Sequence, residues 1–412
     1  MTKPMFVIVG ASLTGAKAAE ELRSNGFDGR VMLVGAEPER PYERPPLTKD
    51  YLRGESGRAK AYVHPDGFYE EQEIELVTGV TVTAIDPGAS RVTLHDGRTL
   101  GYDRLLIATG AEPRRLHVPG ADLDGVCYLR TLADCDLLRA QLNAGGRVVV
   151  VGAGWIGSEF AASARQRGLE VTVIDPQPLH SERIFGRDVA AFYRDVHAQH
   201  GIEFLLGEGV EAFEGHGAVA RVRTASGRLV ECDFAVVGIG VVPRTGLASA
   251  AGLEVNNGIV TDANLQASAP GIFAAGDVAN AWHPFYHRRI RVEHWANALN
   301  QGPAAARAML GERSGYDHIP YFYSDQYEVG MEYSGHAPEW DEVVFRGDRA
   351  DGEFIAFWLR GGCVAAGMNV NIWDVNEHIQ ALIRAAKPVG AAALADHGVT
   401  LESLAGELAA GR

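Results

Sequence analysis

Cysteine is scarce in this chain of 412 residues, and the positions of the four cysteines exclude several kinds of chemistry. No CxxC spacing occurs, so the sequence lacks the signature of a zinc ribbon, a thioredoxin-type redox pair or an iron–sulfur cluster. The pattern predicts reduced, mostly buried thiols in a reducing cytosol. The cysteines are Cys127, Cys135, Cys232 and Cys363, so residues 1–126 contain none.

Long apolar runs and an excess of positive charge are also missing. No apolar run approaches the roughly 18 residues of a membrane-spanning helix, and Met5–Val9 is too short for the apolar core of a signal peptide. The net charge of −15 argues against general binding to nucleic acid or to an anionic membrane. The histidines His283, His287 and His294 do not match a metal-ligand motif with acidic partners. We therefore expect a cytoplasmic protein without a metal site.

Glycine, in contrast, is abundant at 49 residues, and many glycines mark an internal repeat. Each copy has an apolar run that ends in a glycine turn, a helix, a second strand and an acidic residue just beyond it. Continuous apolar runs are typical of parallel strands that are buried on both faces. The repeat therefore predicts an α/β fold with two doubly wound sheets. The first copy comprises residues 6–10, 11–25, 30–34 and Glu37, and the second comprises 147–151, 152–157, 158–166, 170–174 and Asp175.

Other segments complete the expected domains. We expect an antiparallel excursion between the repeats, further buried strands that end on glycine, and an α+β domain of short aromatic-rich strands at the C-terminal end. The excursion comprises residues 74–85 and 91–93 with a turn at Asp96-Gly97, and the buried strands lie at 105–110, 234–240 and 271–277. The C-terminal strands are expected at 326–332, 342–346, 354–359 and 363–368, followed by a helix at 375–386 and a short helix or frayed end after 391.

The glycine turn of the second copy is a complete dinucleotide-binding motif. Gly152 permits a tight turn, Gly154 lets a pyrophosphate approach the backbone, and Gly157 lets helix and strand pack closely. The N-terminus of the helix then offers free N–H groups and partial positive charge. Asp175 lies 18 residues beyond Gly157, near the spacing of an acid that binds the adenosine ribose. Residues 176–182 contain no Lys or Arg for a 2′-phosphate, which favours NADH over NADPH.

The glycine turn of the first copy departs from this motif at one position. Gly10 and Gly15 are present, but Ser12 occupies the middle position. Serine is small, so a pyrophosphate could still approach, and its hydroxyl could donate a hydrogen bond. Glu37 stands in the ribose-binding position and supports a second nucleotide site.

Five short segments resemble one family along nearly the whole chain and in the same order. They are similar to the flavin-dependent ferredoxin reductases of bacterial oxygenase systems, within the glutathione-reductase superfamily. Tyr323 departs from this pattern, because the family often has a tryptophan there. The segments are residues 41–49, 108–110, 276–277, 293–295 and 324–326.

The resemblance implies two Rossmann-like nucleotide-binding domains plus a C-terminal α+β domain. Residues 1–111 and 245–320 would bind FAD, residues 112–244 would bind NADH, and residues 321–412 would form the third domain. The FAD-binding residues that it implies are Arg44, Lys49, Thr109, Gly110, Asp277 and Trp295, in addition to Gly10, Ser12, Gly15 and Glu37.

The resemblance also implies the catalytic residues. Lys49 would lie beside the reactive edge of the flavin, and Glu159 would pair with it and orient the nicotinamide. Each of three of these residues also has a simpler structural interpretation. Lys49 could be a surface lysine, Glu159 a first-turn acid that stabilises the helix dipole, and Trp295 a core aromatic residue.

The absence of cysteine from residues 1–126 excludes two classes of reaction. Disulfide reductases and cysteine peroxidases of this superfamily need a thiolate against the flavin, and residues 1–126 supply none. An external one-electron acceptor is therefore expected. By resemblance it is a small [2Fe–2S] ferredoxin that feeds a haem-thiolate monooxygenase or a Rieske dioxygenase.

Such ferredoxins are acidic, so an acidic reductase needs local basic residues for docking. Arg288, Arg289 and Arg291 are the candidates, with a solvated loop or internal ion pairs as the alternative. A rubredoxin reductase would have a nearly identical sequence. A membrane quinone reductase is disfavoured because residues 375–412 lack a basic amphipathic anchor. A non-enzymatic redox sensor is a further alternative, and both a monomer and a homodimer are compatible with the resemblance.

Overall fold

The computed structural model describes residues 3–179 and 181–410. The chain forms two compact units, and each of them is built from three segments. The first unit comprises residues up to 44, 57–112 and 241–320, and the second comprises 45–56, 113–240 and the residues from 321 onward. Within the described residues, no helix is long and apolar enough to cross a membrane.

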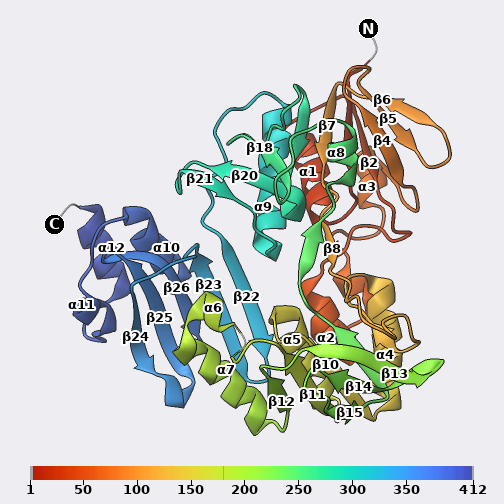
Figure 1. Cartoon of the computed structure of the whole chain (residues 1–412). Helices are drawn as coiled ribbons and strands as arrows, with labels where there is room; N and C mark the ends of the chain where they lie inside the picture. Colours follow the sequence, from red (N-terminus) through yellow and green to blue (C-terminus); the bar gives the residue numbers. More distant parts are fainter. Residues whose placement is uncertain (1–2, 180, 411–412) are drawn as a thin grey trace. The chain divides into compact units, whose positions relative to one another are not determined.

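A five-stranded parallel sheet forms the core of the first unit (Figure 1). Alternate residues of its central strand enter different cores, since Phe6 and Ile8 pack on one face while Val7 and Val9 pack on the other. This is why the strand is a continuous apolar run. The strand order is β19 (Ile272–Ala274), β7 (Arg104–Ile107), β1 (Met5–Val9), β2 (Arg30–Val34) and β3 (Ile74–Val77).

Two long helices cover one face of this sheet. Helices α1 (Leu13–Ser24) and α9 (Trp295–Met309) pack through small side chains such as Ala18 and Ala305, both fully buried. The other face packs on α8 (Gly246–Ala250) and on a three-stranded antiparallel sheet. That sheet consists of β4 (Val82–Asp86), β5 (Arg91–Leu94) and β6 (Thr99–Gly101).

The smaller elements of the first unit lie around this core. A third sheet contains β18 (Ile259–Thr261), β20 (Ala279–His283) and β21 (Arg288–Ile290). Strands β8 (Ala111–Pro113) and β17 (Val241–Pro243) pair where the chain leaves and re-enters the unit. The short helices are η2 (Arg58–Ala61), α3 (Phe68–Glu71) and η3 (Gly276–Val278).

The strand at Ile74–Val77 corrects the predicted antiparallel excursion. This segment pairs in parallel with β2, with Val31 opposite Ile74 and Val34 opposite Val77, and so becomes an edge of the main sheet. Only residues from Val82 onward form the antiparallel sheet. The crossover was not evident in the sequence because residues 35–73 contain only helices of four residues, too short for a helical period.

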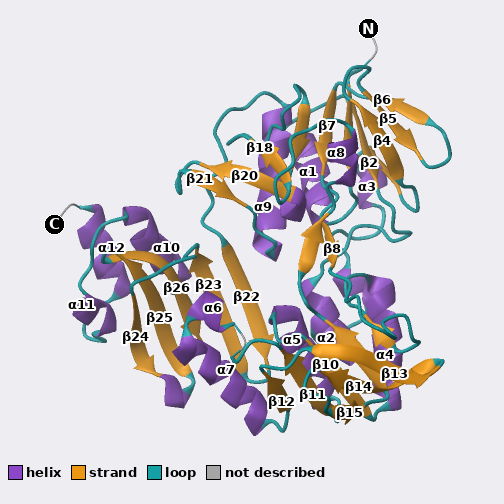
Figure 2. Ribbon diagram, in the orientation of Figure 1, coloured by secondary structure: helices purple, strands orange, loops and turns teal. Residues whose placement is uncertain are grey.

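The second unit repeats the same plan (Figure 2). Its helix α5 (Trp155–Gln166) follows the central strand of the sheet directly, as α1 does in the first unit. An antiparallel sheet of β13 (Val210–His216), β14 (Ala218–Thr224) and β15 (Leu229–Glu231) also recurs. The parallel order is β12 (Glu203–Leu206), β11 (Glu170–Asp175), β10 (Arg147–Val151), β16 (Phe234–Val237) and β9 (Val126–Cys127).

Further helices belong to this unit. Helix α4 (Leu132–Ala144) begins at a capping box, in which Thr131 and Asp134 each accept the other's backbone N–H. Helices α6 (Glu182–Phe185) and α7 (Arg187–Gln199) follow β11. The segment 45–56 contributes η1 (Pro45–Thr48) and α2 (Asp50–Arg53).

The C-terminal sheet is buried on both faces. In β25, Phe354, Ala356 and Trp358 pack with side chains of α6 and α7. On the other face, Gly367 of β26 lies against Ile379 of α10 (Asn376–Ala385). A Cβ on Gly367 would collide with the Ile379 side chain. The order is β22 (Tyr321–Gln326), β23 (Val329–Gly335), β26 (Cys363–Val370), β25 (Glu353–Arg360) and β24 (Glu342–Asp348), with η4 (Arg349–Asp351), α11 (Ala391–Ala395) and α12 (Leu401–Ala409).

The strand that the sequence predicts at 326–332 starts too early. A two-residue turn at residues 327–328 lies near the start of that range, so that β22 ends at Gln326 and β23 begins at Val329. Tyr327 adopts the left-handed conformation with φ of 58° in this turn. No turn was evident in the sequence, because neither Tyr327 nor Glu328 is a residue that favours a hairpin turn.

Candidate functional site

The first glycine of each nucleotide turn is required by the protein itself. Gly10 has φ of +123° and Gly152 has φ of +98°, a region that L side chains rarely adopt. A Cβ on Gly10 would lie 2.1 Å from the carbonyl oxygen of Ala108, and one on Gly152 would lie 2.5 Å from that of Gly238. Each turn therefore passes directly against the neighbouring parallel strand.

The third glycine is required for helix packing. A Cβ on Gly15 would lie 2.0 Å from the carbonyl oxygen of Gly10, and a Cβ on Gly157 would lie 2.0 Å from that of Gly152. Both clashes involve rigid backbone, so no side-chain movement can relieve them. The two turns have the same construction, as the repeat in the sequence predicts.

The middle position behaves differently. Gly154 has φ of −69°, and a Cβ added there would meet nothing within 4 Å. Ser12 has φ of −121° and caps α1 without a side-chain hydrogen bond. Neither backbone needs glycine, so small size matters here only for a ligand that approaches the turn. Serine in the first turn is therefore compatible with the local structure.

A cavity of about 430 Å³ opens at the first turn. It is a concave site of the size that small ligands and cofactors occupy. The turn, the end of β2 and the start of α8 all contribute to it, which suits an adenine nucleotide on a helix N-terminus. Its lining includes Gly10, Ser12, Glu37, Arg44, Thr109 and Thr245.

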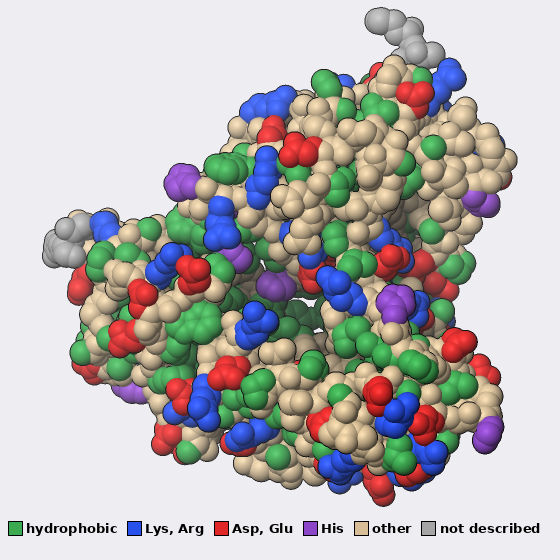
Figure 3. Space-filling view, in the orientation of Figure 1, with side chains coloured by type: hydrophobic (Ala, Val, Ile, Leu, Met, Phe, Trp, Pro, Cys, Tyr) green, Lys and Arg blue, Asp and Glu red, His purple; other side chains and the backbone are tan. Residues whose placement is uncertain are grey.

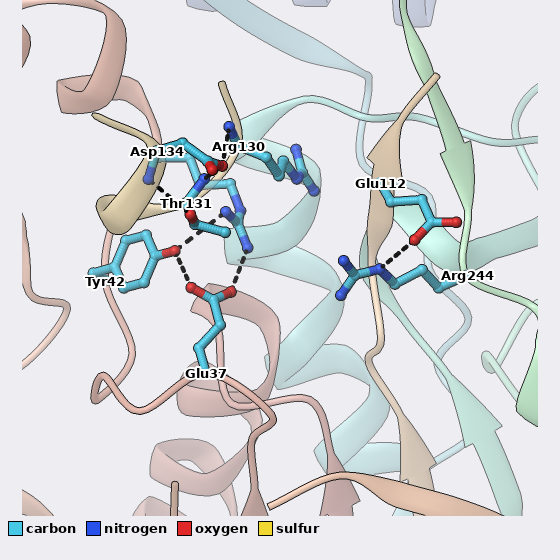
Figure 4. A network of polar contacts seen from close by, with 8 residues as sticks. Glu37, Tyr42, Glu112, Arg130, Thr131, Asp134 and Arg244 are labelled. Atoms are coloured by element: carbon cyan, nitrogen blue, oxygen red, sulfur yellow. Dashed lines mark hydrogen bonds and ion pairs between the residues drawn. The ribbon is translucent and has the colours of Figure 1, made fainter. Parts of the chain in front are cut away.

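Glu37 stands at the end of β2 with two partners. Its carboxylate accepts a hydrogen bond from the hydroxyl of Tyr42 and lies 3.5 Å from Arg44 Nη2. Figure 4 shows Glu37 with Tyr42, and separately the pair of Glu112 and Arg244 at 3.3 Å. An anchored carboxylate with lone pairs left over can accept from ribose hydroxyls. Tyr42 was not predicted as a site residue, although it lies in the segment that carried the resemblance.

The other predicted FAD residues of the first unit are also fixed locally. The Thr109 hydroxyl donates to the carbonyl oxygen of Arg244 at 2.9 Å, and Gly110 follows it with φ of +66°. Asp277 is buried in η3, whose first residue, Gly276, donates its N–H to Gln301 of α9 at 2.9 Å. These contacts hold a buried carboxylate in place, as a polyhydroxyl chain would require.

Trp295 begins α9 and donates its indole N–H to Glu43. Burial raises the pKa of Glu43, while this hydrogen bond and the charge of Lys17 oppose the rise. Trp295 is therefore not a simple core residue, because its polar atom has a half-buried carboxylate as partner.

Asp175 closes the second nucleotide turn. Its Oδ2 accepts from the N–H of Ala153 and its Oδ1 from the N–H of Gln177, both at 2.8 Å. The acid thus fastens the glycine turn to the end of β11. Each oxygen retains a lone pair for a ribose hydroxyl.

Lys49 and Glu159 form a buried ion pair within the second unit. Lys49 Nζ lies 2.6 Å from Glu159 Oε2, and the two side chains are only 13% and 9% exposed. The same carboxylate accepts from Thr48 Oγ1 at 2.5 Å and from Ser324 Oγ at 2.7 Å. Lys49 is therefore not a surface lysine. Glu159 also lies beyond the first turn of α5, so stabilisation of the helix dipole does not explain it.

Tyr323 and Asp325 surround this pair. Lys49 Nζ lies 5.5 Å from the centre of the Tyr323 ring, within cation–π range. Burial raises the pKa of Asp325, an effect that Lys49 opposes and Glu159 enhances. Thr48 and Ser324 were not predicted to act in the site. Ser324 stands in the Ser-Asp-Gln segment, in which the alternation of a strand places Ser324 and Gln326 on one face.

The three arginines predicted to dock a partner differ in their contacts. Arg289 donates to the carbonyl oxygen of Thr261, and Arg291 pairs with Glu293. The Arg288 side chain is exposed on β21 and forms no hydrogen bond or ion pair with other described residues. Acidic and basic side chains alternate over the face of the molecule shown in Figure 3. Among the described residues, no cluster of His, Cys, Asp and Glu is suited to a metal ion.

Comparison with known proteins places the chain in a family. Residues 4–302 match the pyridine nucleotide-disulphide oxidoreductase family, and residues 321–405 match the family described as reductase C-terminal. The ferredoxin–NAD(+) reductase component of an anthranilate 1,2-dioxygenase system from Burkholderia cepacia is 42% identical, over 90% of this chain and 92% of the relative. Putidaredoxin reductase from Pseudomonas putida is 37% identical, over 97% and 96%.

A solved structure and a further relative bear on the acceptor. The reductase in a covalent putidaredoxin reductase–putidaredoxin complex superimposes with a TM-score of 0.94 at 37% identity, over 100% of this chain and 99% of the other. A rubredoxin–NAD(+) reductase from Ectopseudomonas oleovorans is 35% identical, over 82% of this chain and 88% of the relative.

These findings agree with the α/β fold class and the family that the motifs predicted. The members use FAD and NADH, and the glycine turns, the cavity and the anchored acids of this chain fit both nucleotides. The chain is an NADH-dependent flavoprotein oxidoreductase. It belongs to the pyridine nucleotide-disulphide oxidoreductase family and, within it, to the ferredoxin reductases of the putidaredoxin reductase type.

Proposed function

We propose that this chain is an NADH:ferredoxin oxidoreductase that supplies electrons to a bacterial monooxygenase or dioxygenase. The observation that carries this proposal is the absence of cysteine from residues 1–126 beside a buried Lys49–Glu159 pair. Because residues 1–126 supply no thiol that could accept electrons from the flavin, the acceptor has to be external. The relatives, a ferredoxin–NAD(+) reductase component and a putidaredoxin reductase, favour a ferredoxin, and the resemblance implies one of the [2Fe–2S] type.

We assign one nucleotide to each of the two glycine turns. Residues 1–111 and 245–320 bind FAD, residues 112–244 bind NADH, and residues 321–412 form the C-terminal domain. When bound, FAD takes a hydride from NADH and releases the two electrons singly. The protein supplies the groups that hold both nucleotides and the charges around the reacting atoms.

The FAD-binding residues divide by role. Gly10, Ser12 and Gly15 form the pyrophosphate turn, and Glu37 with Arg44 holds the adenosine end. Residues nearer the flavin are Lys49, Thr109, Gly110, Asp277 and Trp295, with Asp277 accepting from ribitol hydroxyls.

The NADH-binding and catalytic residues belong to the second unit. Gly152, Gly154 and Gly157 form the pyrophosphate turn, and Asp175 binds the adenosine ribose. Lys49 supplies positive charge that stabilises the reduced flavin. Glu159 holds the Lys49 ammonium group in place through their ion pair.

Arg288 is the centre of the docking surface that we propose, with Arg289 and Arg291 beside it. An acidic ferredoxin would meet positive charge here, on a chain whose net charge is −15. Arg288→Glu should lower the ferredoxin-dependent rate several-fold at low salt and weaken its salt dependence, while ferricyanide reduction stays intact. Arg91→Glu in β5 makes the same charge change and serves as the control. Equal behaviour of the two variants would contradict this surface.

The proposed compartment is the cytoplasm. All four cysteines are free in the structure, and burial raises the pKa of Cys135 and of Cys232 to about 12. Thiols that stay protonated are stable in a reducing compartment.

The choice between acceptors can be made by one assay. NADH-dependent reduction of cytochrome c is measured with a [2Fe–2S] ferredoxin, with rubredoxin and with neither as the relay. We expect a large stimulation by ferredoxin. A stimulation by rubredoxin alone would favour the second candidate function, a rubredoxin reductase. The similarity to the rubredoxin–NAD(+) reductase from Ectopseudomonas oleovorans supports this candidate. Slow turnover with every acceptor would contradict both and favour a redox sensor.

A further inference from the structure

Three buried polar side chains continue the hydrogen bonding of Glu159 away from Lys49. Ser324 and Gln326 come from β22 and His197 comes from α7, and each side chain is about 1% exposed. Ser324 Oγ lies 2.7 Å from Glu159 Oε1, and Gln326 Nε2 lies 3.0 Å from Ser324 Oγ. His197 Nε2 lies 2.6 Å from Gln326 Oε1. The four side chains form one continuous line of hydrogen bonds.

The direction of every bond in this line can be derived. An ionised carboxylate only accepts, so the Ser324 hydroxyl gives its single hydrogen to Glu159. Ser324 Oγ then accepts from the amide NH₂ of Gln326, which turns the amide oxygen toward His197. His197 must therefore carry a hydrogen on Nε2. All donors in the line point toward Glu159.

This line orients groups and does not conduct protons. A hydroxyl can pass a proton along, but the neutral amide of Gln326 has no readily exchanged proton to hand on. What the amide does is fix the rotation of the Ser324 hydroxyl. With that hydroxyl held on Oε1, Glu159 keeps Oε2 for Thr48 and Lys49, at 2.5 Å and 2.6 Å.

We propose that Gln326 is a positioning residue for the Lys49–Glu159 pair and that His197 fixes Gln326 from behind. The inference rests on the proposed function, because it takes Lys49 and Glu159 as the catalytic pair. Without the amide, the Ser324 hydroxyl is free to rotate, and Glu159 loses a constant donor. The charge of Lys49 is then less well held.

Two substitutions at Gln326 separate the effects of the amide. Gln326→Met keeps the length of the side chain and removes both polar groups. Gln326→Glu keeps the shape but only accepts, so it competes with Glu159 for the single hydrogen of Ser324. Tyr321→Phe is the matched control on the same strand, because the Tyr321 hydroxyl pairs with Glu332 at 2.7 Å and takes no part in the line.

The first readout is stopped-flow reduction of the FAD-loaded protein by NADH over a range of pH. We expect the limiting rate to fall about tenfold in Gln326→Met and further in Gln326→Glu, with the dissociation constant of NADH changed less than about twofold. The acid limb of the rate profile should also move, because Glu159 has lost a constant hydrogen-bond donor. Tyr321→Phe should match the wild type in all three respects.

The second readout does not use activity. In ¹⁵N-histidine NMR, His197 of the wild type should be a neutral ring with the hydrogen on Nε2, and its Nε2 shift should change in Gln326→Met. A hydrogen on Nδ1, or an unchanged pH profile in a folded Gln326→Met, would overturn the proposal. If the Gln326 variants do not fold, Ser324→Ala removes one oxygen atom and must move the acid limb.

The role of Gln326 and the proposed electron acceptor can be contradicted independently of each other. The two readouts use only NADH and the histidine ring, so they do not depend on the identity of the electron acceptor. A wild type that does not reduce ferredoxin, yet shows the His197 tautomer and the shift of the acid limb, would contradict the acceptor and retain the role of Gln326.

Discussion

At the scale of single residues, the two nucleotide turns show which glycines the fold needs. Gly10 and Gly15 are excluded from substitution by backbone atoms at 2.1 Å and 2.0 Å from an added Cβ, whereas the middle position is open. The motif in the sequence made Ser12 look like the defect of the first site. The structure places Ser12 where a side chain costs the protein nothing.

A pair of substitutions tests this difference. Ser12→Gly should leave the FAD content unchanged. The free energy of unfolding should change by no more than about 1 kcal/mol, which is the cost of the extra backbone freedom of glycine. Gly15→Ala should lose FAD and unfold at lower temperature, because its Cβ meets the carbonyl oxygen of Gly10 at 2.0 Å. Flavin absorbance after gel filtration and thermal unfolding report the two effects. A Gly15→Ala variant with full FAD content would contradict the packing argument.

Glu43 gives a prediction about pH. Burial raises its pKa in the folded protein, so the folded state binds a proton more tightly than the unfolded state. This contribution to stability is present at low pH and is lost as pH rises from the ordinary carboxyl value through the raised one. Glu43→Gln keeps an acceptor for the indole N–H of Trp295 and has no such loss.

Thermal unfolding of Glu43→Gln and wild type, both with excess FAD, checks this sign. The stability of the variant relative to wild type should increase as pH rises through that window, and then stay constant toward pH 8. A relative stability that falls with rising pH would mean that the Glu43 carboxylate is stabilised in the folded state.

At the scale of elements, Arg346 connects β24 to the last helices. Its guanidinium donates to the carbonyl oxygen of Leu394 at the end of α11 and to that of Val399 before α12, at 3.4 Å and 2.6 Å. The side chain is buried and forms no ion pair with an acidic side chain in the described part of the chain. The orphaned carbonyls of a helix end thus find a charged donor.

Arg346→Met should destabilise the C-terminal segment by about 2–3 kcal/mol, the usual cost of losing hydrogen bonds to a charged group. Limited proteolysis should then cleave between α11 and α12 earlier than in the wild type. Arg349→Met is the control three residues later, since Arg349 is 38% exposed and its ion pair with Asp188 is worth under about 1 kcal/mol. Equal proteolysis of the two variants would show that Arg346 does not anchor this segment.

Some strands could be predicted from the sequence and others could not. Strands such as Arg147–Val151 were predictable because four consecutive valines follow the first residue and the turn that comes next has three glycines. The edge strand Ile74–Val77 and the turn at Tyr327 were not. The first joins the sheet only through a crossover without a helical period, and the second adopts φ of 58° with a tyrosine. Tertiary contacts decide such segments, and they leave no local pattern.

At the scale of the whole molecule, the repeat and the family were predictable, and much of the site's inner structure was not. Lys49 and Glu159 are 110 residues apart in the sequence, and their pairing was implied by the resemblance. Their ion pair at 2.6 Å is observed in the second unit. The donors from Thr48 and Ser324 were not evident, because hydroxyl residues are common and their spacing carries no signal. Gln326 lies in the segment 324–326 that carried the resemblance, but its contact with His197 was not evident, because His197 lies outside every motif.

We propose that electrons from NADH leave this protein singly, to an external iron–sulfur protein, without passing through a cysteine thiol. The most direct test mixes the FAD-loaded protein anaerobically with one equivalent of NADH and then with excess oxidised [2Fe–2S] ferredoxin. We expect complete reduction of the protein by one equivalent of NADH, followed by the reduction of two ferredoxins. A requirement for two equivalents of NADH, or ferredoxin that stays oxidised, would contradict it.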